Sequence, residues 1–89
     1  MDVKLAVEKA KAFVLELFAN EQIRNLGLEE VEFDESEHAW LITLGFTRPW
    51  DQANFASKLG MLEPRTYKII RISEDGTVVS VKNRQPAIA

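Results

Sequence analysis

The sequence predicts a single α+β domain in which an N-terminal helix packs on a four-stranded antiparallel meander sheet. Apolar residues recur at helical spacing between residues 3 and 17, and the apolar pattern alternates from residue 31 onward. An Asp-Gly dipeptide separates the last two predicted strands. A chain of 89 residues that is 46% hydrophobic suits one core. We therefore expect one domain over residues 1–89, with a frayed tail from about residue 84.

The first element is a helix that begins after Asp2, whose carboxylate can cap the first turn. Asn20 and Gly27 are the expected stopping points, with Ile23 and Leu26 in one further turn between them. Apolar residues three and four positions apart form the stripe that should face the sheet: Val7, Ala10, Phe13, Val14 and Leu17.

Two strands follow Gly27. In the first, Val31 and Phe33 alternate with acidic residues, which is typical of an edge strand with one solvated face. The second strand runs from His38 to Thr47. Its residues predicted to face the core are Trp40, Ile42, Leu44 and Phe46.

The last two strands form a hairpin around Asp75-Gly76, which predicts a two-residue type I′ turn. That turn places Ile72 opposite Val79 and Ile70 opposite Val81, with all four on the core side. The outer face, meaning the side of the sheet turned away from the helix, then carries an apolar group: Leu41, Tyr67, Ile69 and Val78.

The connection over residues 48–64 is too long for a hairpin loop, and it has room for a short helix over residues 51–59. Asp51 would cap this helix and Gly60 would end it. We expect its apolar residues to cover an open end of the sheet, with a solvent-facing recognition loop as the alternative. These residues are Trp50, Phe55, Leu59, Met61 and Leu62.

Composition and motifs argue against several functions. The formal net charge of −3 opposes a nucleic-acid-binding surface, and no stretch approaches the roughly 20 apolar residues of a membrane span. The chain has no cysteine, and its single histidine, His38, lacks ligands at metal-site spacing. We therefore expect a cytoplasmic protein with no catalytic residues, metal or cofactor, and with no nucleic-acid or membrane partner.

A helix followed by a meander with an acidic first strand, from Asp2 to Asn83, is similar to the cystatin-like group of folds. The resemblance implies a helix lying across a curved antiparallel sheet. The inhibitor signature Gln-x-Val-x-Gly is absent, so the resemblance does not imply protease inhibition.

Two hypotheses for function follow. The first is a non-enzymatic protein-interaction domain that forms a homodimer or binds a partner protein through the outer face at Leu41, Tyr67, Ile69 and Val78. The second is a small-ligand-binding domain or weak enzyme with a pocket between the helix and the open end of the sheet. Its lining would be Trp40, Phe46, Trp50 and Phe55, with Arg48 or Arg65 as the charged group.

Overall fold

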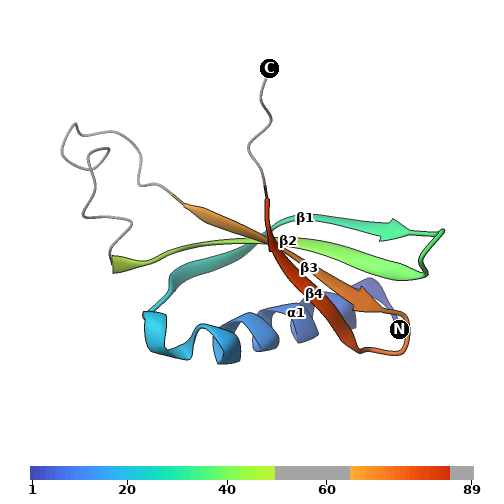
Figure 1. Ribbon diagram of the computed structural model, residues 1–89, viewed down its shortest axis with the longest axis horizontal. Helices are drawn as coiled ribbons and strands as arrows, with labels where there is room; N and C mark the ends of the chain where they lie inside the picture. Colours follow the sequence, from blue (N-terminus) through green and yellow to red (C-terminus); the bar gives the residue numbers. More distant parts are fainter. Residues whose placement is uncertain (50–64, 85–89) are drawn as a thin grey trace, which may run out of the picture.

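The computed structural model describes residues 1–49 and 65–84, and it shows one helix packed on a four-stranded antiparallel sheet (Figure 1). The strand order is β1-β2-β3-β4, so each strand pairs with the next one along the chain. This confirms the predicted α+β meander. The predicted helix over residues 51–59, its apolar covering residues and the tail beyond residue 84 lie outside the described residues.

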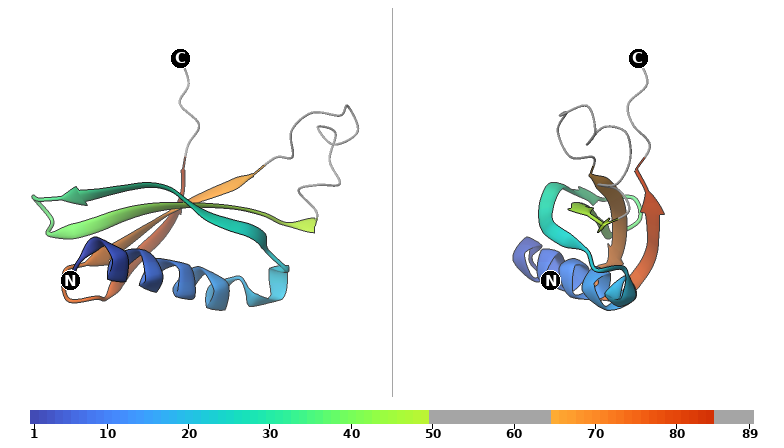
Figure 2. Two further views of the ribbon diagram at one scale, coloured as in Figure 1. Left: turned by 180° about the vertical axis from the view of Figure 1, so that it is seen from behind. Right: turned by 90° about the vertical axis from the view of Figure 1, so that its left-hand side faces the viewer.

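The helix α1 spans Val3–Leu17, and the Asp2 side chain caps it by accepting a hydrogen bond from the Leu5 amide at 2.9 Å. Its fully buried residues are Ala6, Ala10 and Val14, whose small side chains let the helix lie close to the sheet. Figure 2 shows α1 running beneath the sheet along its length. In the described part of the chain, no helix is long and apolar enough to cross a membrane.

The helical segment ends near Asn20, the first of the two expected stopping points, and does not continue towards Gly27. The last helical residue, Leu17, is 53% exposed, and Phe18 packs against the core in its place, with its ring 5.5 Å from that of Phe46. A 3₁₀ turn at Ala19–Glu21 follows, and then Gln22 adopts a left-handed conformation with φ of 51°. This conformation ends the 3₁₀ turn, so the expected helical turn with Ile23 and Leu26 is not formed and β1 begins at Arg24.

Strand β1 spans Arg24–Asp34, β2 spans Ala39–Thr47, and β3 spans Thr66–Ser73. Gly27 therefore lies inside β1, where it pairs with Gly45, and does not precede the strand as predicted. As predicted, β1 is an edge strand. The predicted core residues of β2 and β3 are fully buried, except that Trp40 is half-buried against the core: Ile42, Leu44, Phe46, Ile70 and Ile72.

The hairpin between β3 and β4, which spans Val78–Asn83, differs from the prediction at its turn. The Ser73 amide donates to the Thr77 carbonyl oxygen at 2.9 Å, so the loop has three residues and not two. Gly76 has φ of 95°, whereas Asp75 does not share the positive φ that a type I′ turn requires.

This longer loop shifts the pairing by one residue, so that Ile72 lies opposite Val78. A bulge at Val79 then restores the predicted pairing of Ile70 with Val81. As a result Val78 packs against the core, and Val79 is 57% exposed on the outer face. The predicted positions of these two valines were therefore wrong, and the reason is the bulge.

The core makes a direct prediction about Phe46. Phe46→Ala removes a fully buried ring that packs against Phe18, so we expect a loss of about 3–5 kcal/mol in the free energy of unfolding. Urea denaturation followed by circular dichroism measures this loss. Leu15→Ala, at a helix residue that is 52% exposed, is the control and should stay within about 0.5 kcal/mol of the parent. Equal losses in the two variants would contradict the core described above.

The hairpin register makes a second prediction. Val78→Lys brings a charge against the core, so its unfolding midpoint should fall clearly below that of the parent. Val79→Lys changes an exposed residue and should alter the stability by no more than about 0.5 kcal/mol. Thermal denaturation of both variants distinguishes the two registers, because the two-residue turn predicts the opposite order of stability.

Candidate functional site

The outer face is the candidate site, because α1 covers only the other side of the sheet (Figure 2). The residues that β2 contributes to the centre of the outer face are small, and they lie between larger side chains of β1 and β3. Thr43 and Thr47 are 4% and 1% exposed, although they point away from the helix. The outer face comprises Glu30, Glu32 and Asp34 of β1, Ala39, Leu41, Thr43, Gly45 and Thr47 of β2, Arg65, Tyr67, Ile69, Arg71 and Ser73, and Val79, Ser80, Lys82 and Arg84.

Apolar side chains occupy the middle of this face. Leu41, Tyr67 and Ile69 are half-buried, as the sequence predicted for a partly apolar surface. Val79 replaces Val78 in this group, because the bulge exchanges the two. The guanidinium of Arg84 lies 5.2 Å from the centre of the Tyr67 ring, in a cation-π contact that leaves Tyr67 half-buried.

Two ion pairs cross β2 and join its two neighbours. Arg65 Nη2 lies 3.4 Å from Glu29 Oε2 and also donates to the Asn25 carbonyl oxygen at 2.9 Å. Arg71 Nη1 lies 3.6 Å from Asp34 Oδ2. These side chains connect β3 with β1 and leave a central stretch of the outer face between them.

Gly45 makes the first of these crossings possible. A Cβ atom at this position would lie 2.9 Å from Arg65 Nη2 and 3.0 Å from both Glu29 Oε2 and Tyr67 Cε1. The first distance is shorter than real Cβ contacts and the other two are tighter than most, so a side chain at this position would force the end of the Arg65 side chain to shift. Sequence reasoning missed this role, although a glycine within an otherwise β-forming strand is a signal for close approach of another group.

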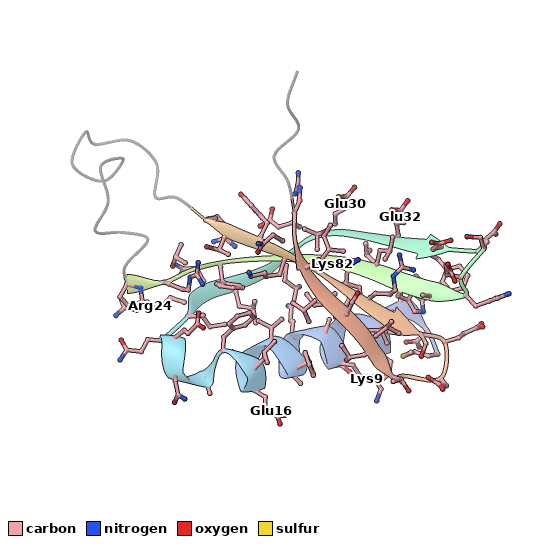
Figure 3. The ribbon with its side chains drawn as sticks, in the orientation of Figure 1. Lys9, Glu16, Arg24, Glu30, Glu32 and Lys82 are labelled. Carbon is pink, nitrogen blue, oxygen red and sulfur yellow. The ribbon has the colours of Figure 1, made fainter. Side chains whose placement is uncertain are left out.

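Three charged residues of the outer face remain without a side-chain partner in the described ranges. Glu30 and Glu32 point away from α1 on β1, and Lys82 lies on β4 (Figure 3). Across the middle of the face, Arg65 and Arg71 are therefore paired with carboxylates of β1. Among the described residues, the unpaired carboxylates lie along the β1 edge and the unpaired ammonium lies at the β4 edge. The outer face thus carries opposite charges on its two sides.

Asp34 organises the turn that leads into β2. Its Oδ1 accepts hydrogen bonds from the Ser36 hydroxyl at 2.7 Å, the Ser36 amide at 3.0 Å and the Glu37 amide at 3.3 Å. The hydrogen bond from the Ser36 hydroxyl is the largest cause that lowers the pKa of Asp34, and the two amides and Arg71 act in the same direction. The carboxylate therefore stays ionised in the folded protein at neutral pH.

The predicted ligand-binding residues that the structure describes are Trp40, Phe46, Arg48 and Arg65, and they do not form one cluster. Trp40 and Phe46 share the helix side of β2 but are six residues apart, or about 20 Å along a strand. Arg48 lies near Phe46, where it donates to Glu21 Oε1 at 3.0 Å and to Thr66 Oγ1 at 3.1 Å. Arg65 lies on the opposite, outer face. Trp50 and Phe55 lie outside the described residues.

The surroundings of His38 contain no metal site. Its Nδ1 lies 3.6 Å from Glu74 Oε2, and both side chains are exposed. Over residues 1–49 and 65–84, no three side chains of histidine, aspartate or glutamate are placed to hold a metal ion. The described part of the structure therefore adds no metal-binding group to those considered from the sequence.

Comparison with known proteins found no match: no family model, no curated protein and no solved structure matches this chain. The structure itself shows one helix packed on a four-stranded antiparallel sheet.

The Asp34 carboxylate makes a pH-dependent prediction. Asp34→Asn removes its charge, so at neutral pH the variant should be less stable than the parent. Because the folded-state pKa is lowered, the stabilisation is present above the ordinary value of 3.8 and is lost as the pH falls through the folded-state pKa. The difference in urea midpoint between parent and variant should therefore shrink on acidification below about pH 4. Glu35→Gln controls for the change in net charge, and a difference that is constant with pH would contradict this assignment.

Proposed function

We propose that this chain is a non-enzymatic protein-interaction domain whose contact surface is the outer face of the sheet. The observation that carries the proposal is the charge arrangement of that face: among the described residues, two carboxylates on β1 and a lysine on β4 have no side-chain partner, and apolar side chains lie between them. Separated charges of opposite sign around apolar residues steer and orient a protein partner. Over residues 1–49 and 65–84, the side chains of Glu30, Glu32 and Lys82 form no ion pair or hydrogen bond.

The apolar centre supports the same proposal. Tyr67 and Ile69 are adjacent outward-facing residues of β3, where a sheet that only faces water usually carries threonine, lysine or glutamate. Tyrosine supplies a large contact area with few rotatable bonds and is enriched at protein interfaces. Leu41 lies on the neighbouring strand, opposite Arg71 and diagonal to Ile69.

We further propose the cystatin-like group as the architectural relative of this domain, because α1 lies along one side of the antiparallel sheet (Figure 1). The proposal concerns the fold only, since the chain lacks the Gln-x-Val-x-Gly signature of the inhibitors. A cytoplasmic location also stays a prediction from composition.

The test compares two lysine substitutions that add the same charge on opposite sides of the domain. Ile69→Lys changes the outer face, and Leu15→Lys changes an exposed residue of α1. We expect Ile69→Lys to weaken binding to protein partners at least about tenfold, because it places a charge in the apolar centre. Leu15→Lys should bind like the parent.

Sedimentation velocity measures self-association, and parallel capture from cell extract compares binding of other proteins to parent and variants. Circular dichroism establishes that each variant is folded. Binding by Ile69→Lys equal to that of Leu15→Lys in both measurements would remove the outer face as the contact surface.

A further inference from the structure

We infer that the occupant of the outer face is a second copy of this chain, related by a two-fold axis that runs parallel to the strands. This inference rests on the proposed function, because it takes the outer face to be the contact surface. It specifies the partner, the symmetry and the residues that meet.

The inference starts from one row of residues across the sheet. Glu30 pairs with Thr43, Thr43 with Ile69, and Ile69 with Lys82. The row therefore begins with a carboxylate on β1 and ends with an ammonium on β4, and neither has a side-chain partner in the described part of the chain. Three strand spacings, about 14 Å, separate its ends, so the two charges do not pair within one chain.

A two-fold axis along the strands, passing between β2 and β3, exchanges the ends of this row. Glu30 of one copy then faces Lys82 of the other, and the symmetry creates this contact twice. Thr43 of one copy faces Ile69 of the other at the centre. The neighbouring row pairs Glu32 with Leu41 and Leu41 with Arg71, so the second carboxylate also lies on the side of the partner's β4.

The other in-plane axis is unfavourable. A two-fold axis across the strands would place β1 of one copy on β1 of the other, so that Glu30 and Glu32 would face carboxylates. Sheets that pack face to face keep their strand directions within about 30° of each other, and an axis close to the strand direction satisfies this preference. Of the two in-plane axes, only the one along the strands therefore brings opposite charges together.

The size of the face sets the expected strength. Four strands about 4.8 Å apart and about eight residues long give a patch near the lower limit of stable interfaces. We therefore expect a dissociation constant on the order of micromolar, with the chain dimeric at roughly 100 μM.

The decisive experiment uses charge reversal and mixing, with sedimentation velocity as the measurement. Glu30→Lys and Lys82→Glu should each weaken the homodimer at least about tenfold, because like charges then meet twice. An equimolar mixture of the two variants should dimerise like the parent, since both contacts are again between opposite charges. The controls Glu16→Lys and Lys9→Glu make the same charge changes on α1 (Figure 3) and should leave dimerisation unchanged.

Each result has a defined meaning. A parent that is monomeric at roughly 100 μM overturns the inference, while binding of another protein that is lost in Ile69→Lys would still support the proposed function. A dimer that both charge variants leave intact, or a mixture that does not recover, overturns this symmetry axis. Recovery in the mixture, together with unchanged controls, supports it.

Discussion

Burial of β2 on both of its faces is the constraint on which the rest of this structure depends. Every residue from Ile42 to Thr47 is buried, although only one side of the strand contacts the helix. Large side chains fill the helix side, and threonine and glycine occupy the other. This division lets α1 approach through its alanines and lets arginines of β3 lie over the strand from the outside.

The small residues of β2 also decide which charges of the outer face are paired. Arg65 and Arg71 reach acidic partners on β1 because β2 has small residues, Gly45 and Ala39, close to where these two side chains cross it. Between the two crossings, Leu41 and Thr43 separate β1 from β3, and the carboxylates there have no partner among the described residues. The positions of these unpaired carboxylates of β1 are therefore related to the side chains of the central strand.

Much of the fold could be predicted from residue patterns, because the alternation in β2 and β3 determines which side chains face the core. The register near the last turn could not be predicted in this way. Asp75-Gly76 is compatible with a two-residue loop and with a three-residue loop, since both place glycine at positive φ. The choice depends on whether Val78 or Val79 packs under the helix. Of the candidate site, Leu41, Tyr67 and Ile69 were predicted from the sequence. The ion pairs across β2 were not, because they join side chains of strands that are not adjacent, and the local residue pattern gives no information on such contacts.

The three interruptions of strand pairing all lie on the two edge strands. The β2–β3 register is continuous over its described length, whereas β1 has irregularities at its start and at Glu29, and β4 has one at Val79. Both edge strands are therefore bent out of the regular spacing that a further strand would need for pairing. Such irregular edges disfavour growth of the sheet by strand addition, the route by which exposed edges seed fibrils.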